Sequence, residues 1–572
     1  MEQNLQEAFV FGYERLVSWT DLLDRINVFP VADSDTGCNL KISLAPLRQF
    51  KGGRAHIMHR LLASATGNSG NIAARFFSGL LTADSSKDLL HAAKTGRDYA
   101  WQAIGDPKQG TILTVFDELV HALKAEPFDG KKKSVSSLMD HLQEAVSSTS
   151  ELLPDLRRAG VIDAGALGMF IYLEGFFKRL VDQTDSFRPI TEIFRKKLQI
   201  ASSFKPESVN GYCVDTLLRV DSQSEVTVEQ LSKFGQSVVA VPDRSLLKIH
   251  LHTDNPQALR NRLESLGEIV QWSDDDIGKS IMEFPRVHPG HQAIHIMTDA
   301  AGSVTRETAG KLEITLLDSY IIAGDRSLPE TLCSPSDIYS LMRKGKKVST
   351  AQASLFERHQ CYKSVLEQYP RVLYICVGSV FTGNYDVAMA WKKENDPDNR
   401  LTVIDSAAAS GRLGTIAIAT ARFANRAKDE NSVIGFAEAS VKNCEEYVFP
   451  DRLKYLVAGG RLSKTKGFFG DRLHMKPVIS PTRHGAKKVG IVRDQEDQFK
   501  FALQRLKTHM DDNSASFIML EYSDNLDWVR DSVMTKIKKH YPQAELMLQP
   551  LSLTSGVHMG PGTWAVAFLP EH

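Results

Sequence analysis

Apolar residues recur at helical spacing through residues 1–180. Leu5, Phe9, Tyr13 and Leu16 show this pattern near the start of the chain, and a repeat of three to four residues is typical of an amphipathic helix. Four polar, glycine-containing turns interrupt the helical segments. We therefore expect an all-α N-terminal domain over residues 1–195, with its polar turns gathered at one end of the helices.

The pattern changes after a charged connector at residues 183–206. Residues 248–253, KIHLHT, alternate between polar and apolar side chains, as in a strand with one buried face. His250 and His252 should therefore point to the same side of that strand. We expect a small α/β domain over residues 207–287.

The C-terminal half repeats a different plan, in which a short apolar run ends in a polar turn and a helical segment follows. The repeats are AIHIMTDAAGSVT, VLYICVGSVFTGNYDVA and LTVIDSAAASGRLGTIAIATA. Strands that alternate with helices favour a parallel sheet whose ligands bind at the carboxyl ends of the strands. The polar residues expected at those ends are Asp299, Ser379, Thr382, Asn384 and Asp405.

Composition narrows the class of protein. At 572 residues the chain is too long for a single core, and Lys+Arg equals Asp+Glu at 69 each, so nothing predicts a nucleic-acid partner. Six scattered cysteines without a CxxC pair are typical of a reduced, cytoplasmic chain. The N-terminus lacks a signal-peptide pattern, and charges interrupt the apolar run at residues 159–177, so we expect no membrane span.

The stretch VFPVADSDTGCNL carries the first candidate chemistry. Asp33 and Asp35 are separated by one residue, among the turn formers Pro30, Ser34 and Gly37. Clustered carboxylates without cysteine or histidine suit Mg²⁺, whose shell phosphates often complete. The alternative is a solvated acidic turn.

Three further turns share a glycine-rich character. They span Ala65–Gly79, Gly110–Val115, which includes Thr111, and Gly160–Gly168, which includes Asp163. A helix that begins directly after a glycine turn presents free backbone N–H groups to phosphate. The alternatives are ordinary turns between helices and, for Thr111, a helix N-cap.

Cys213 is the third partner for the two histidines of the predicted strand. Two imidazoles and a thiolate are ligands that suit Zn²⁺. A purely structural histidine pair is the alternative, and the fourth ligand and the role of the metal stay open.

Four motifs of the N-terminal half, NVFPVADSDTGCNL, TGNSGNIAARFFSG, QGTILTV and LLPDLRRAGVIDAGALG, resemble in order the ATP-binding (L-type, DAK2) domain of the dihydroxyacetone kinase superfamily. They resemble most the ATP-binding subunit of bacterial fatty-acid kinase. The resemblance implies an eight-helix barrel that binds ATP with two Mg²⁺ ions, for which Asp33 and Asp35 are ligands. The implied nucleotide-binding residues are Thr36, Asn39, Gly67, Asn68, Ser69, Gly70, Thr111, Asp163 and Gly165. Ser34 and Cys38 depart from the family pattern, which has DGD and a threonine.

Residues 207–287 resemble the middle domain of the same subunit, whose cysteine and HxH bind zinc. The resemblance implies that Cys213, His250 and His252 hold a Zn²⁺ ion, which would be structural.

Residues 292–572 resemble the DegV family, the fatty-acid-binding subunit of this kinase, in which two α/β lobes bury an acyl chain. The implied fatty-acid-binding residues are Thr350, Ser379, Thr382, Gly383, Asn384, Arg461 and His558. TAQAS replaces the family's TSQPS, and FTGN replaces its LSGT. Taken singly, Arg461 is also explained as a surface cation and His558 as a helix cap or turn histidine.

Together the resemblances imply a fatty acid kinase that converts ATP and fatty acid to acyl phosphate and ADP for phospholipid synthesis. Asp33 and Asp35 would hold the donor, and Arg461 and His558 the acceptor. A fatty-acid carrier or sensor with a regulatory nucleotide domain, and a dihydroxyacetone-type (glycerone) kinase, are the alternatives. We also expect a homodimer, transient contact with a membrane surface, a downstream acyltransferase and a cytoplasmic location.

Overall fold

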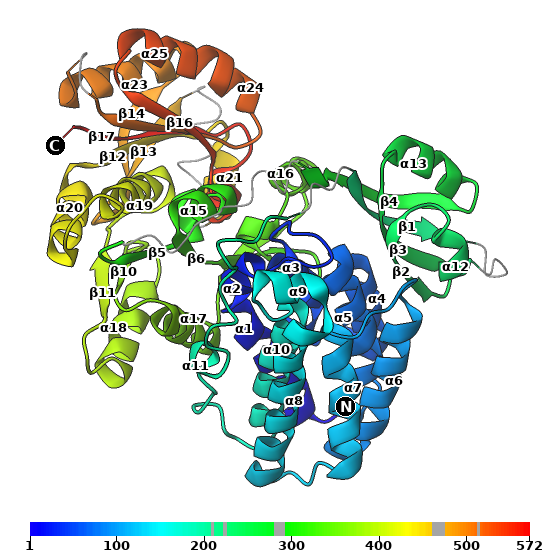
Figure 1. Ribbon diagram of the computed structural model, residues 1–572. Helices are drawn as coiled ribbons and strands as arrows, with labels where there is room; N and C mark the ends of the chain where they lie inside the picture. The colour runs from blue at the N-terminus through cyan, green and yellow to red at the C-terminus, as the bar shows by residue number, and fades with distance from the viewer. Residues whose placement is uncertain (207–210, 221–225, 279–291, 460–474, 512–514, 572) are drawn as a thin grey trace. The chain divides into compact units, whose positions relative to one another are not determined.

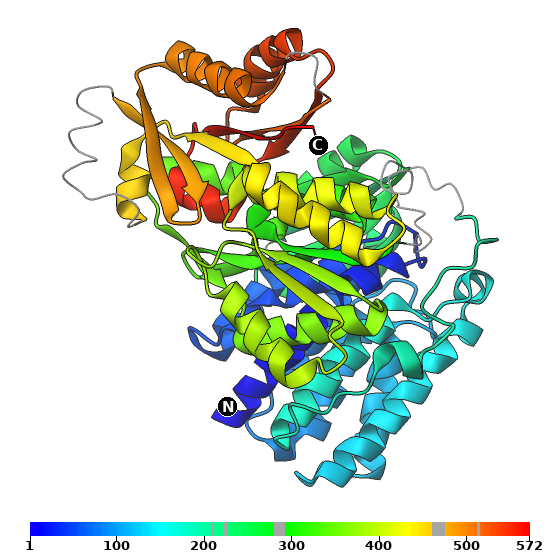
Figure 2. The same cartoon turned by 90° about the vertical axis from the view of Figure 1, so that its left-hand side faces the viewer.

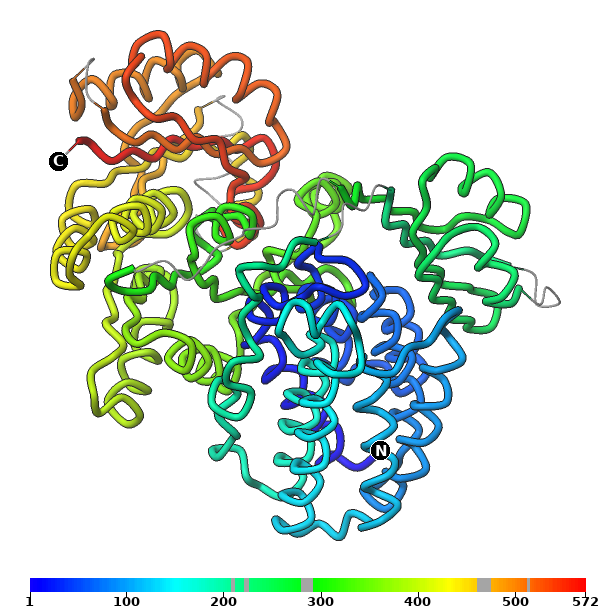
Figure 3. The backbone as a smooth tube through the Cα atoms, in the orientation of Figure 1, coloured from blue at the N-terminus to red at the C-terminus, as the bar shows by residue number. Residues whose placement is uncertain are grey.

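The computed structural model describes residues 1–206, 211–220, 226–278, 292–459, 475–511 and 515–571. The chain divides into two compact units, Met1–Phe284 and Pro285–His572, whose backbones can be followed in Figure 3. The first contains a helical region and a small sheet, and the second is α/β. The predicted fold class is confirmed. Among the described residues, no helix has the length and apolar character needed to cross a bilayer.

The helices of the first unit run alongside one another (Figure 1). They are α1 (Gln3–Val17), α2 (Thr20–Arg25), α3 (Thr36–Leu44), η1 (Ala45–Arg48), α4 (Gly53–Ser64), α5 (Gly67–Leu80), η2 (Ser86–Asp88), α6 (Leu89–Gln102), α7 (Ile112–Ala125), α8 (Lys132–Leu152), α9 (Pro154–Ala159), α10 (Ala164–Leu180) and α11 (Ile190–Ile193).

Helix α10 is the core of this bundle. Apart from Glu174, which pairs with Arg15, its sequence AGALGMFIYLEGFF is apolar or small on every side. These residues are buried, as expected for a helix surrounded by others. It packs against α1, α3, α7 and α8. Gly12 of α1 permits the close approach, because a Cβ there would lie 2.6 Å from the ring of Tyr172.

A four-stranded antiparallel sheet completes the first unit. Its order is β2-β3-β1-β4, with elements β1 (Tyr212–Arg219), α12 (Val228–Leu231), β2 (Gln236–Asp243), β3 (Leu246–Thr253), α13 (Pro256–Glu264) and β4 (Glu268–Asp276). One face packs Ile249 and Leu251 against the residues of α12 and α13. The sheet also contacts α5, and the Ala240 N–H donates to the Ala103 carbonyl at 2.8 Å, which ties β2 to the end of α6.

The second unit contains three sheets. The parallel sheet has the order β11-β10-β5-β6, the mixed sheet β14-β13-β12-β17-β15-β16 and the small antiparallel sheet β8-β7-β9. The strands are β5 (His295–Asp299), β6 (Ile314–Leu317), β7 (Ser319–Ala323), β8 (Arg326–Pro329), β9 (Val348–Gln352), β10 (Val372–Cys376), β11 (Leu401–Asp405), β12 (Glu445–Phe449), β13 (Lys476–Thr482), β14 (Gly485–Val492), β15 (Phe517–Tyr522), β16 (Glu545–Pro550) and β17 (Trp564–Leu569).

Helices cover these sheets. They are η3 (Ala300–Gly302), α15 (Arg306–Leu312), η4 (Glu330–Leu332), α16 (Pro335–Arg343), α17 (Leu355–Gln368), α18 (Asn384–Asn395), α19 (Ser410–Ala424), α20 (Glu430–Asn443), α21 (Leu453–Ala458), α23 (Gln495–His509), α24 (Leu526–Trp528), the π-helix η5 (Val529–Met534), α25 (Thr535–His540) and α26 (Leu553–Met559). Figure 2 shows α19 and α20 on one side of the parallel sheet and α17 and α18 on the other. The predicted parallel sheet is confirmed.

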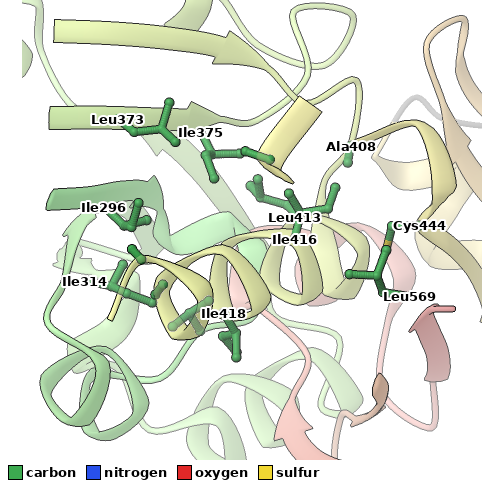
Figure 4. Packing of buried hydrophobic residues seen from close by; sticks show 14 of the residues in the cluster. Ile296, Ile314, Leu373, Ile375, Ala408, Leu413, Ile416, Ile418, Cys444 and Leu569 are labelled. Atoms are coloured by element: carbon green, nitrogen blue, oxygen red, sulfur yellow. The ribbon is translucent and has the colours of Figure 1, made fainter. Parts of the chain in front are cut away.

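Helix α19 lies in a core that both large sheets share. Leu413, Ile416 and Ile418 pack in one cluster with Ile296 of the parallel sheet and Leu569 of the mixed sheet (Figure 4). Apart from Arg412 and Arg422, most residues of α19 are therefore apolar or small.

Two buried glutamates meet the N-terminus of α19. Glu446 accepts hydrogen bonds from the Ser410 hydroxyl at 2.7 Å and from the Arg412 N–H at 3.0 Å, and Ser410 also donates to Glu521 at 3.2 Å. Both glutamates are fully buried, and the Ser410 hydroxyl lies within hydrogen-bond distance of a carboxylate oxygen of each. Burial, together with the charge of Glu521, holds the pKa of Glu446 well above its usual range, and burial raises the pKa of Glu521. We therefore expect the pair to retain a proton, while the Ser410 hydroxyl joins α19 to β12 and β15 through the two carboxylates.

Retention of this proton makes stability depend on pH. Glutamate in the unfolded chain releases its proton at lower pH than the folded pair does. The free energy of unfolding should therefore fall as the pH rises above about 4.5, by up to about 1.4 kcal/mol per pH unit for each retained proton. In Glu521→Gln, the amide donates to Glu446 without titrating. We expect this variant to gain stability relative to the wild type as the pH rises from 4 to 8.

Urea unfolding, followed by pulsed hydrogen exchange of α19 peptides at each pH, would measure this difference. Glu438→Gln, on the exposed surface of α20, is the matched control and should follow the wild type. Parallel profiles for the wild type and Glu521→Gln would contradict the shared proton.

Candidate functional site

The DSD turn aims two carboxylates into a cavity of about 200 Å³ in the first unit, which Asp33 and Asp35 line. Ser34 between them is left-handed, with φ of 59°. The Asn27 amide donates to Asp33 at 2.7 Å, and the Thr36 hydroxyl donates to Asn27 at 3.0 Å. This chain of hydrogen bonds fixes the turn against the start of α3.

Electrostatics make this pair a candidate cation site. Burial raises the pKa of Asp33 well above its usual range, and the charge of Asp35 adds to the shift. Burial also raises the pKa of Asp35, against a hydrogen bond from Asn39. A bound cation would relieve both the desolvation and the mutual repulsion, and two carboxylates at one cavity wall fit Mg²⁺.

The glycine turn at the start of α5 forms the adjacent wall. Gly67 has φ of +64°, and a Cβ on it would lie 2.0 Å from the Asn39 amide nitrogen, so only glycine fits. Asn39, Asn68 and Ser69 also line the cavity. Gly70 is not among the lining residues. A Cβ there would lie 2.1 Å from the Ser43 hydroxyl, so its place in the structure is in the packing of α5 on α3.

The other two turns also reach this cavity. Thr111 accepts from the Leu113 N–H at 3.4 Å as the N-cap of α7, so the predicted cap is present. Asp163 accepts from the Ala166 N–H at 2.7 Å as the N-cap of α10, and burial raises its pKa to about 7. Thr36, Thr111, Asp163 and Gly165 line the cavity. All four turns therefore meet, as predicted.

The sheet supplies a further wall, which carries Cys213, His250 and His252. In the register of β1 and β3, Cys213 lies opposite His252 and Asp215 lies opposite His250. The two imidazole centroids are 5.3 Å apart, and the strand prediction for both histidines is confirmed.

These three side chains fit a zinc ion. Their ligand atoms all lie within 4.8 Å of one another, and Cys213 Sγ lies 3.8 Å from His250 Nδ1. The buried Nε2 of His250 has no hydrogen-bond partner within the described ranges. Burial raises the pKa of the Cys213 thiol and lowers the pKa of His252 to about 4, so His252 offers a neutral nitrogen.

Sequence reasoning missed several polar groups at this site. Lys108 and Asp106 line the cavity and pair at 2.8 Å, and the only sequence signal was their position next to the Gly110 turn. Asp215 contacts the site from the sheet. Its two-residue spacing from Cys213 on a strand was the available signal.

The second unit contains its own cavity, of about 380 Å³. Apolar side chains provide the larger part of its lining. Its polar lining residues include Asp299, Thr350, Thr382, Asn384, Lys488 and His558. The residues of the apolar lining include Val448, Leu456, Ile479 and Met559.

A buried carboxylate braces one wall of this second cavity. Asp299 accepts hydrogen bonds from the Tyr374 hydroxyl at 2.8 Å, the Val377 N–H at 2.6 Å and the Asn384 amide at 2.7 Å. Burial raises its pKa to about 6. Asp299 thereby fixes Asn384, which follows Thr382 at the start of α18.

Three predicted acyl-site residues are not among the described lining of the cavity. The Ser379 hydroxyl donates to Asp405 at 2.5 Å, and Gly383 is the N-cap residue of α18. Arg461 lies outside the described residues.

Curated relatives match about half of the chain. An uncharacterized protein of Staphylococcus saprophyticus is 28% identical over 316 residues, which are 50% of this chain and 57% of the relative. Protein YloV of Bacillus subtilis is 30% identical over 297 residues, which are 46% of this chain and 53% of the relative. The chain therefore spans about half the length of the curated relatives it matches.

Two solved structures each align with about half of this chain. A DegV family protein from Thermus thermophilus, described by its fatty acid binding, aligns with a TM-score of 0.44 and 20% identity over 49% of this chain and 100% of that chain. DegV of Bacillus subtilis, described as a fatty acid binding protein, aligns with a TM-score of 0.44 and 18% identity over the same shares.

Three family models match in sequence order. The DAK2 domain matches residues 30–178, the FakA-like middle domain of fatty acid kinase matches residues 209–280, and the DegV family, described as uncharacterised, matches residues 293–571. One polypeptide thus carries, in order, segments that match the DAK2, FakA-like middle domain and DegV family models.

Proposed function

We propose that this chain is a fatty acid kinase that transfers the γ-phosphate of ATP to the carboxylate of a fatty acid held in its own DegV domain. The observation that carries the proposal is the pairing of two cavities in one chain. One has two half-buried carboxylates beside a helix N-terminus in the region matching the DAK2 domain. The other, in the DegV region, is mainly apolar, and its polar lining residues include hydroxyls, an imidazole, Asp299 and Lys488.

The first cavity would hold the phosphoryl donor. Asp33 and Asp35 would bind Mg²⁺, which when bound neutralises charge on the ATP phosphates. Gly67, Asn68 and Ser69, in the first turn of α5, line the cavity, and such a helix start favours an anion. Thr36, Thr111 and Asp163 would contribute further contacts to the nucleotide.

The cluster of Cys213, His250 and His252 would hold Zn²⁺ beside the donor. Two nitrogens and one sulfur are a ligand set that zinc prefers. Since all three residues line the same cavity as Asp33 and Asp35, a zinc ion would add positive charge to the wall opposite the carboxylates.

The second cavity would hold the acyl chain. Burial of an acyl tail is favourable by about 0.8 kcal/mol per CH₂, whereas an ionised carboxylate is costly to bury without partners. Thr350, Thr382 and His558 would supply those partners, and hydrogen bonds to a charged group contribute about 1.5–3 kcal/mol each. Arg461 is proposed as a further cation for the carboxylate.

The chemistry needs positioning more than proton transfer. A fatty acid carboxylate is already ionised at neutral pH, so its oxygen can attack the γ-phosphorus in line while ADP leaves. The residues that hold each reactant supply the alignment. The acyl phosphate product is an activated donor, so a downstream acyltransferase is the expected partner, with membrane-surface contact for delivery of the lipid. A homodimer in the cytoplasm remains part of the proposal.

Asp33→Asn and Asp35→Asn test the donor site. Each should lower ATP-dependent formation of hydroxylamine-trapped acyl phosphate by at least about 100-fold, because a metal ligand supplies several kcal/mol of charge stabilisation. Bound fatty acid, measured by native mass spectrometry, should be unchanged. Asp21→Asn, on the exposed surface of α2, is the control. Wild-type turnover in either variant would refute the donor assignment, and wild-type protein that binds lipid without making acyl phosphate would be a carrier.

His558→Ala and Thr382→Ala test the acceptor site. Because the tail outweighs any one head-group contact, each variant should retain part of its fatty acid. Acyl phosphate formation should fall about tenfold or more, since the carboxylate must also be aimed at the phosphate. The two assays above, run on one preparation, measure both quantities. His540→Ala, exposed at the end of α25, should behave as the wild type, and full activity in both test variants would place the head group elsewhere.

A further inference from the structure

Asp215 belongs to the sheet but bonds to the start of α5. Its carboxylate accepts from the Gly67 N–H at 2.9 Å, the Thr66 hydroxyl at 3.2 Å and the Asn71 amide at 3.1 Å. Thr66 precedes α5 and Gly67 is its first residue. One side chain of β1 therefore holds the glycine turn that lines the cavity.

The same carboxylate also bonds to two residues of β3. His250 Nδ1 lies 3.1 Å from Oδ2, the oxygen that Gly67 also contacts, and Lys248 Nζ lies 3.3 Å from Oδ1. Asp215 and His250 are both buried. Five donors thus converge on one carboxylate, three from the helix start and two from the sheet.

The bond to Nδ1 decides what His250 presents to its surroundings. In a neutral imidazole whose Nδ1 carries the proton that it donates to Asp215, Nε2 keeps its lone pair. That buried Nε2 has no hydrogen-bond partner in the described part of the chain. A carboxylate behind a histidine is the arrangement that orients metal-ligating imidazoles.

We infer that Asp215 is a positioning residue for both halves of the site. It orients His250 as a metal ligand, and it fixes the Gly67 backbone at the phosphate-facing start of α5. This inference rests on the proposed function, because it takes the cavity to bind zinc and a nucleotide.

Three variants of the full chain separate these roles. Asp215→Asn keeps the size of the side chain and removes the negative charge that accepts the hydrogen bond from His250 Nδ1. Asn71→Ala removes one donor on α5 and leaves the bond from His250 intact. Asp274→Asn, on exposed β4 with a hydrogen bond from Trp272 at 3.3 Å, is the matched control. Zn²⁺ affinity is measured against a competing chelator, and nucleotide affinity with Mg-ADP by calorimetry.

We expect Asp215→Asn to weaken Zn²⁺ binding by about 10- to 100-fold, as for other residues that hydrogen-bond to a metal-ligating histidine. We expect it to weaken Mg-ADP binding by about 2- to 10-fold, which corresponds to the loss of one hydrogen bond. Asn71→Ala should weaken Mg-ADP binding with Zn²⁺ affinity unchanged, a split that general destabilisation does not produce. Asp274→Asn should match the wild type in both.

Loss of only one affinity in Asp215→Asn, or unchanged affinities in it, would overturn the shared role while leaving the proposed function intact. If Asp215→Asn does not fold, Asn71→Ala decides, because unchanged Mg-ADP binding or weakened Zn²⁺ binding in that variant overturns the inference. Wild-type protein that binds neither probe would overturn the proposed function and this inference together.

Discussion

The carboxylate of Asp215 is the contact on which the first unit's site depends. A buried charge is costly unless several donors satisfy it, and here the donors come from both the start of α5 and strand β3. Sliding of the sheet along the helix would break several of these bonds at once. The sheet therefore presents Cys213, His250 and His252 to the same cavity that the helical turns form.

Each unit has a pair of neighbouring carboxyl groups, half-buried in the first unit and fully buried in the second. Asp33 and Asp35 line a cavity, so an ion can reach the charge that burial and repulsion disfavour. Glu446 and Glu521 instead meet protein donors from Ser410 and the backbone of α19, and we expect a retained proton to relieve their repulsion. The repulsion and desolvation of two neighbouring carboxylates thus favour ligand binding in the first unit and structural hydrogen bonds in the second.

Local chemistry explains why some site residues were predictable and others were not. Asp33 and Gly67 stand in segments whose glycine, proline and small polar residues predict a turn. Gly70 belongs to the same motif as Gly67, yet it packs against Ser43, and Ser379, in the SVFTGNY motif, donates to Asp405. A motif identifies a turn, but the direction of each side chain within it depends on neighbours that are distant in the chain.

Periodicity and residue type alone determined the helical N-terminal region, the parallel sheet and the shared face of His250 and His252, because backbone geometry sets these periods locally. Only the tertiary structure decided that the sheet of the first unit shares a cavity with the DSD turn, and that Asp215 joins the two. Gly67 and Asp215, for example, are 148 positions apart in the chain. Contacts at such separations follow from packing and the pairing of buried charge, which no local pattern encodes.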